Sequence, residues 1–158
     1  MNYKEQKLWD EICEFELDDD EAVYTFSDRL AKENQWTKGF ALRAIDEYKK
    51  FIFLICTTHQ PRTPSDEVDK VWHLHLLYTR SYWNDFFAGV LKREVHHGPT
   101  RGGPEEKEKF QNAYAQTLQH YRITFQCEPP SDLWPRDHLR QSPHKINLGI
   151  IRTLRTIL

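Results

Sequence analysis

The sequence predicts an all-α protein, folded as a single compact bundle of about five or six helices. Apolar residues recur at steps of three and four in five stretches of the chain, which is the spacing of helices that bury one face. No stretch of the sequence alternates apolar and polar residues with the period of two that is typical of strands. We expect one helical domain over residues 1–158. It divides into an N-terminal helical pair (1–36), a core that carries the main motif (37–128) and an irregular, proline-containing tail with a short C-terminal helix (129–158).

The N-terminal pair is predicted from two short apolar stripes. The first helix would bury Leu8, Ile12 and Phe15. The second helix is expected to start in the acidic run Asp18–Asp20, because negative charge is favourable at the positive end of a helix dipole. Its buried stripe would consist of Val23, Phe26 and Leu30.

A third helix is predicted between Thr37, which can cap it, and Pro61, which cannot continue it. Its apolar residues follow the helical spacing closely, as a helix that faces the core requires. They are Phe40, Ala44, Tyr48, Phe51 and Ile55.

The strongest helix start is the stretch Thr-Pro-Ser-Asp-Glu at residues 63–67. Thr63 or Ser65 can accept the N–H groups of the first turn, and the acidic residues that follow suit the helix dipole. A long helix is therefore expected from about Asp66 to about Phe87, with Gly89 as its stop. Its apolar stripe would consist of Val68, Trp72, Thr79, Tyr82 and Phe86.

A loop is expected over residues 92–104, and Pro104 followed by two glutamates starts the last clear helix. This helix would bury Phe110, Ala113, Tyr114, Thr117, Tyr121 and Phe125. Trp134 would then pack on the core as an aromatic plug. Residues 146–158 have the pattern of a short amphipathic helix that could contact a partner.

Charge and cysteine content argue against several classes of protein. With 22 basic and 24 acidic residues, the net charge is −2, which provides no general attraction to nucleic acid. Cys13, Cys56 and Cys127 are far apart, so free thiols are expected rather than a disulfide framework. The charged start lacks the apolar stretch of a secretory signal, and the longest apolar run, residues 51–56, is too short to span a bilayer. The expected location is the cytoplasm, with no transmembrane segment.

The residues that point to chemistry lie between Asp69 and His97, where four of the eight histidines fall. Histidine is the commonest metal ligand, and a carboxylate is its usual companion. Asp69 and His73 are four residues apart and share a helix face. His73 and His75 point about 200° apart on a straight helix, so a straight helix cannot bring both to one ion.

Two arrangements of a metal site follow from this spacing. In the first, Asp69 and His73 project from the helix, and His96 or His97 folds back from the loop. Two nitrogens and one carboxylate suit Zn²⁺ with water, or non-haem Fe²⁺. In the second, the helix is broken or distorted near its tryptophan, and His75 joins the site.

The same residues also allow a purely structural arrangement. Asp69 and His73 would then form a pair on the helix surface, and the histidines at 96–97 would cap the next helix. His75 would be a core histidine that is hydrogen-bonded to Tyr82 or to a backbone carbonyl.

The stretch Val68–His75 reads V-D-K-V-W-H-L-H and is followed by Tyr82 and His97. This pattern resembles the glycine-rich domain-containing-protein-like family, with its D-x-x-W-H-x-H core, and looks most like its compact bacterial members. The resemblance covers about Tyr48 to Trp134. It implies that six residues act as one unit: Asp69, Trp72, His73, His75, Tyr82 and His97. The longer plant members carry a glycine-rich tail that this sequence lacks, so functions tied to that tail are not carried over. The resemblance names no substrate.

Two functions are consistent with these observations. The first is a metal-dependent enzyme that acts on a small polar substrate with Zn²⁺ or Fe²⁺. The ion would be held by Asp69, His73 and His97, with His96 or His75 as a further ligand or supporting group. Tyr82 would orient the substrate or donate a proton, and His75 is the other candidate catalytic residue. The second function is a non-catalytic protein-interaction module, in which the same cluster is structural.

His75 is the residue on which the two hypotheses differ most. It falls at the centre of the apolar stripe, so its ring is expected to be mostly buried and neutral near pH 7. Its expected hydrogen-bond partners are Tyr82 and a group from the helix that carries Tyr114 and Tyr121.

Overall fold

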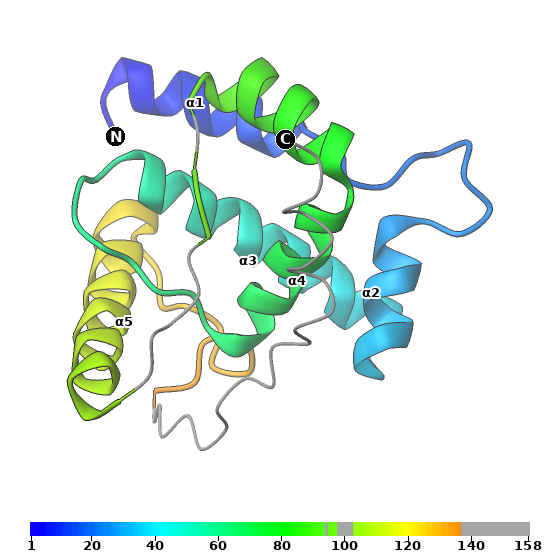
Figure 1. Ribbon diagram of the computed structural model, residues 1–158. Helices are drawn as coiled ribbons and strands as arrows, with labels where there is room; N and C mark the ends of the chain where they lie inside the picture. The colour runs from blue at the N-terminus through cyan, green and yellow to red at the C-terminus, as the bar shows by residue number, and fades with distance from the viewer. Residues whose placement is uncertain (94, 98–102, 137–158) are drawn as a thin grey trace.

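The computed structural model describes residues 1–93, 95–97 and 103–136. Over these residues the chain forms six helices and no strand (Figure 1), which confirms the predicted all-α class. In chain order they are α1 (Tyr3–Glu14), α2 (Phe26–Asn34), α3 (Lys38–Cys56), α4 (Asp66–Leu77), η1 (Arg80–Leu91) and α5 (Pro104–Phe125). No helix in this part of the chain is both long and apolar enough to cross a membrane.

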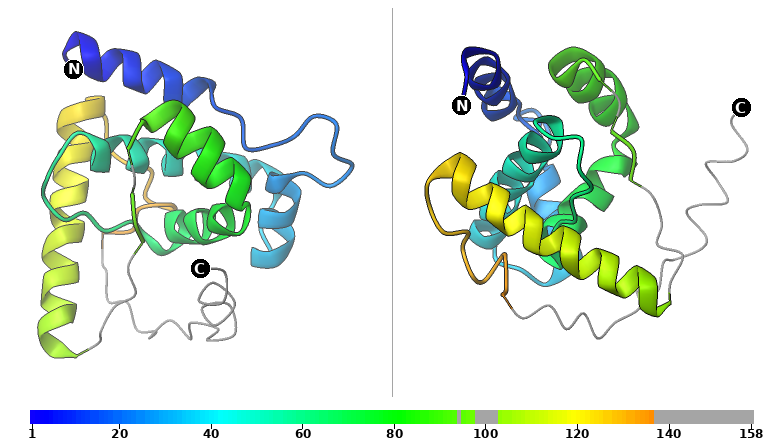
Figure 2. Two further views of the ribbon diagram at one scale, coloured as in Figure 1. Left: turned by 45° about the horizontal axis from the view of Figure 1, so that its top comes forward. Right: turned by 90° about the vertical axis from the view of Figure 1, so that its left-hand side faces the viewer.

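Helix α3 forms the centre of the fold, because α1, α2, α4 and α5 all pack against it (Figures 1 and 2). Thr37 caps it as predicted, by accepting a hydrogen bond from the N–H of Phe40. The middle of its predicted stripe is fully buried and the two ends are partly buried: Ala44, Tyr48 and Phe51, and then Phe40 and Ile55. The helix also buries Ile45, Ile52 and Leu54, as a helix surrounded by neighbours should.

Helix α1 agrees with its predicted stripe. Ile12 is fully buried, and Leu8 and Phe15 pack against the core from partly buried positions. Asn2 caps the helix, and Glu5 completes a capping box with it.

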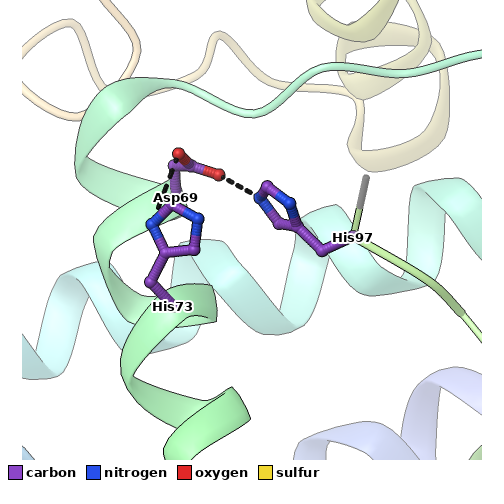
Figure 3. A group of neighbouring side chains, drawn as sticks. All are labelled: Asp69, His73 and His97. Carbon is purple, nitrogen blue, oxygen red and sulfur yellow. Dashed lines mark hydrogen bonds and ion pairs between the residues drawn. The ribbon is translucent and has the colours of Figure 1, made fainter. Parts of the chain in front are cut away.

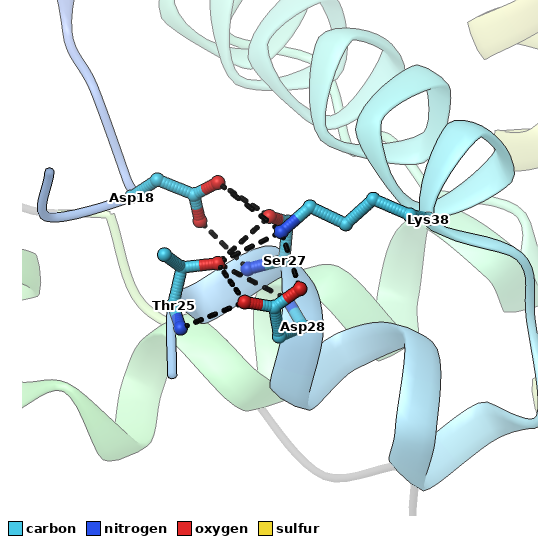
Figure 4. Close-up of polar contacts among 5 residues, drawn as sticks. All are labelled: Asp18, Thr25, Ser27, Asp28 and Lys38. Carbon is cyan, nitrogen blue, oxygen red and sulfur yellow. Dashed lines mark hydrogen bonds and ion pairs between the residues drawn. The ribbon is translucent and has the colours of Figure 1, made fainter. Parts of the chain in front are cut away.

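Helix α2 starts later than predicted. Its first residue is Phe26, and the cap is Thr25, whose side chain accepts from the N–H of Asp28 (Figure 4). The Asp28 carboxylate accepts in return from the N–H of Thr25, which makes a capping box. A hydrogen bond from Lys38 to Asp28 lowers the pKa of this carboxyl to about 2. Two reciprocal hydrogen bonds outweigh the weaker preference of an acidic run for a helix start.

The acidic run lies instead in the loop before α2. Asp18 reaches the start of the helix from this loop, where its carboxylate accepts from the backbone N–H and the hydroxyl of Ser27 (Figure 4). Val23 is fully exposed on the same loop, so its assignment to the buried stripe was wrong, whereas Phe26 and Leu30 are buried as predicted.

The long helix predicted from Asp66 to Phe87 is two helices. Helix α4 ends at Leu77, Tyr78 leaves the helical conformation, and η1 continues to Leu91 as a π-helix, past the predicted stop at Gly89. The buried residues of η1 are Tyr82, Phe86, Phe87 and Leu91, which recur at steps of four and five. This wider step suits a π-helix, because i→i+5 hydrogen bonds make its turn longer than that of an α-helix.

Helix α5 begins at Pro104 with two glutamates in its first turn, as predicted. Tyr114, Thr117 and Tyr121 of its predicted stripe are buried. Trp134 is buried too, and its indole N–H donates to the buried Glu47 of α3 at 2.8 Å, so the predicted aromatic plug is confirmed. The helix predicted within residues 146–158 lies outside the described residues.

Candidate metal centre

The start of α4 determines where the first two candidate ligands lie. Ser65 caps the helix, and its hydroxyl accepts from the N–H of Val68. Of the two predicted caps, Thr63 and Ser65, the helix uses Ser65. Asp69 therefore lies at the end of the first turn and His73 one turn later on the same face. The distance from His73 Nδ1 to Asp69 Oδ2 is 3.7 Å.

The third candidate ligand comes from the short segment 95–97, which follows η1. His97 folds back onto α4, and its Nε2 lies 2.8 Å from Asp69 Oδ1 (Figure 3). The His73 and His97 rings have centroids 4.6 Å apart. One ligand atom from each of Asp69, His73 and His97 lies within 4.8 Å of the other two. The structure thus brings together two imidazoles and a carboxylate from segments 28 residues apart.

Exposure is graded across this cluster. The Asp69 side chain is 6% exposed, that of His97 20% and that of His73 48%. The Trp72 ring covers the inner side, with its centroid 4.4 Å from that of His97. The carboxylate therefore lies at the closed end of the cluster, and His73 at the end that opens to solvent.

Two of the three ligand pairs lie near the spacing that one ion requires, and all three pairs lie within 4.8 Å. Bonds of about 2.0–2.2 Å to nitrogen and oxygen place neighbouring ligand atoms about 3 Å apart. The His97–Asp69 distance is slightly shorter than this, and the His73–Asp69 distance slightly longer. The same His97 nitrogen either donates a hydrogen bond to Asp69 or gives its lone pair to a metal, so an ion would displace the proton of this hydrogen bond.

His96 and His75 lie outside this three-residue cluster. His96 is exposed, and its ring lies beside that of Trp83, with centroids 5.9 Å apart. This is consistent with extended backbone, in which neighbouring side chains point to opposite sides. His75 lies on the buried face of α4, away from the exposed face that carries His73.

His75 is fully buried, as predicted. Its Nδ1 is hydrogen-bonded to the Tyr48 hydroxyl at 2.9 Å and its Nε2 to the Ser81 hydroxyl at 3.2 Å. Burial lowers the pKa of His75 to about 3. The two hydrogen-bond partners differ from those expected, because Tyr82 contacts the imidazole through its ring, at 5.1 Å between centroids, and not through its hydroxyl. Ser81 carried no signal in the sequence, since its position depends on η1.

Tyr82 is also fully buried, and burial raises its pKa to about 12 against the opposing effect of a hydrogen bond from Trp72. Its hydroxyl accepts from the indole N–H of Trp72 at 2.8 Å and donates to the carbonyl of Val95 at 3.1 Å. These contacts link α4 and η1 to the segment that carries His97.

Comparisons with known proteins add one weak similarity. The chain is 25% identical over 91 residues to glycine-rich domain-containing protein 2 of Arabidopsis thaliana. The match includes 54% of this chain but 11% of that protein, so the chain spans about a tenth of the length of the relative that it matches. No family model matches the sequence, and no solved structure matches it.

Proposed function

We propose that the domain binds one divalent transition metal ion, Zn²⁺ or Fe²⁺, through Asp69, His73 and His97, and that the ion serves the conversion of a small polar substrate. The observation that carries the proposal is the convergence of two imidazoles and one buried carboxylate within 4.8 Å. This donor set is the one found in sites of zinc hydrolases and of non-haem iron oxygenases.

The number of ligands and their exposure favour a reactive site over a structural one. Structural zinc sites are closed by four protein ligands, whereas catalytic sites keep a position for water or substrate. Here three side chains converge, and the nearly half-exposed His73 leaves one side of the cluster accessible to solvent. An ion bound there would polarise a substrate oxygen and lower the pKa of a bound water.

Burial of Asp69 gives a second reason to expect a cation. A buried carboxylate costs free energy unless it is paired or hydrogen-bonded. Each oxygen of the Asp69 carboxylate faces a histidine nitrogen, one from His73 and one from His97. A neutral histidine can bind a metal ion. A divalent ion at this point would compensate the charge more fully than a hydrogen bond does.

A non-catalytic interaction module is the second candidate function, and one observation favours it. The hydrogen bond between His97 and Asp69, together with the contact of His97 with Trp72, holds the segment 95–97 on α4 without any ion. In that case the cluster only stabilises the fold, and the surface that binds a partner protein lies elsewhere on the domain.

Metal analysis of protein purified without a histidine tag tests the first proposal. We expect close to one equivalent of metal per chain, and stabilisation of about 2.7 kcal/mol when the free ion is at 100 times its Kd. His73→Ala should abolish this stabilisation at little structural cost, because the side chain is half exposed.

His96→Ala is the matched control, because His96 is an exposed histidine one residue from His97 that lies outside the cluster. It should keep the full metal-dependent stabilisation. The proposed site would be ruled out if Zn²⁺, Fe²⁺ and Mn²⁺ left the melting temperature of the wild type unchanged. It would also be ruled out if His73→Ala and His96→Ala lost the metal-dependent stabilisation equally. Either result would leave the interaction module as the candidate function.

A further inference from the structure

A chain of two hydrogen bonds joins the cluster to the interior of the protein. The indole N–H of Trp72 donates to the Tyr82 hydroxyl, which donates in turn to the carbonyl of Val95. Trp72 belongs to α4, Tyr82 to η1, and Val95 lies two residues before His97. The three residues therefore connect α4, η1 and the segment 95–97.

The two hydrogen bonds can affect the position of His97 through Val95. Val95 lies two residues before His97 in the same short segment, so a hydrogen bond that fixes the Val95 carbonyl also restricts where the backbone of His97 lies. The hydrogen bond from Tyr82 fixes that carbonyl at 3.1 Å. The Trp72 ring then limits His97 from the inner side, at 4.4 Å between ring centroids.

Tyr82 is itself held rigidly. Its side chain is fully buried, and its ring packs against that of Phe87, with centroids 4.3 Å apart. Both side chains are buried by η1. The packed ring directs the hydroxyl to the carbonyl of Val95, 3.1 Å away.

We propose that Tyr82 is the positioning residue of the metal site: through the carbonyl of Val95 it holds His97 where its Nε2 meets Asp69 and the ion. This inference rests on the proposed function, and it assigns Tyr82 a task that acts through His97 and needs no contact with substrate. Removal of a group hydrogen-bonded directly to a metal ligand lowers affinity by about 10- to 100-fold, and Tyr82 acts through the backbone two residues away, so the lower end of this range is expected.

The test is the affinity for Zn²⁺ of Tyr82→Phe, measured by competition with a chromophoric chelator. We expect a loss of about tenfold. Tyr121→Phe is the matched control, because it also removes one buried tyrosine hydroxyl, whose partners are Glu47 and Lys50. It should lower the stability of the metal-free protein to a similar degree and leave the affinity for Zn²⁺ unchanged.

A double-mutant cycle separates positioning from general loosening of the fold. If Tyr82 acts through His97, then Tyr82→Phe should have no further effect on Zn²⁺ affinity in a His97→Ala background. Additive effects in the two backgrounds, or equal losses in Tyr82→Phe and Tyr121→Phe, would overturn the inference.

Failure of the metal site itself gives a different result, because the wild-type protein would then not bind Zn²⁺. The positioning of His97 would still be tested by NMR of the metal-free protein, through the ring N–H that His97 shares with Asp69. We expect a slowly exchanging signal in the wild type and in Tyr121→Phe, and its loss in Tyr82→Phe. A signal that persists in Tyr82→Phe contradicts the assigned task.

Discussion

Acidification from pH 7.5 to pH 5 should destabilise the protein through His75, which lies in the core between Tyr48 and Ser81. Burial lowers the pKa of this imidazole from 6.5 to about 3 in the folded state. Between these two values the unfolded chain binds a proton that the folded chain does not. The contribution of His75 to stability is therefore fully present above pH 6.5 and decreases as the pH falls towards 3.

The size of the effect follows from the width of this window. For each pH unit below 6.5, the free energy of unfolding falls by about 1.4 kcal/mol. At pH 5 it is therefore lower by about 2 kcal/mol. Screening by solvent does not reduce this effect, because His75 is fully buried.

Urea denaturation in the presence of EDTA, at pH 7.5 and at pH 5, measures the free energy of unfolding without any metal contribution. His75→Gln is the comparison, since an amide can still hydrogen-bond to Tyr48 and Ser81 but does not titrate in this range. The variant should be less stable at pH 7.5 and lose about 2 kcal/mol less than the wild type on acidification. An equal loss in both proteins would refute the assignment of this pH dependence to His75.

Three further predictions concern other parts of the fold. Thr25→Ala removes the cap of α2 and should lower the free energy of unfolding by about 1 kcal/mol in urea titrations, whereas a change below the error of the measurement would argue against the capping box. Glu47→Ala leaves the indole of Trp134 and the ammonium of Lys50 without their shared carboxylate, and a loss of about 3 kcal/mol is expected by calorimetry. Burial raises the pKa of Cys56 to about 11, so iodoacetamide at pH 8 should modify the exposed Cys127 well before Cys56, as peptide mass mapping can check.

Local features of the fold could be predicted from the sequence because they depend on neighbouring residues. The caps of α3 and α4 and the proline start of α5 each follow from a few adjacent side chains. The proximity of Asp69 and His73 is of the same kind, since four residues make one helical turn.

The break between α4 and η1 could not be predicted from apolar spacing. Val68, Trp72, Tyr82 and Phe86 of the predicted stripe are buried, although Thr79 is exposed, so the spacing is compatible with one long helix. The break lies at Tyr78, whose backbone leaves the helical conformation, and no apolar spacing marks that residue.

Spacing alone left open whether His96 or His97 folds back onto α4, and only the resemblance singled out His97. Both belong to one short segment, and the hydrogen bond that anchors this segment joins Tyr82 to Val95, 13 positions apart. The partners of His75 depend in the same way on packing between helices, because Tyr48 belongs to α3 and Ser81 to η1.

The order of the three clustered residues along the chain has a consequence for η1. Asp69 and His73 precede this helix and His97 follows it, so an ion that joins them would act as a crosslink around a loop that contains all of η1. Such a crosslink reduces the entropy of any state in which the loop opens. Metal would then suppress local unfolding of a helix that contributes no ligand, and amide hydrogen exchange within residues 80–91 would report occupancy of a site that these residues do not form.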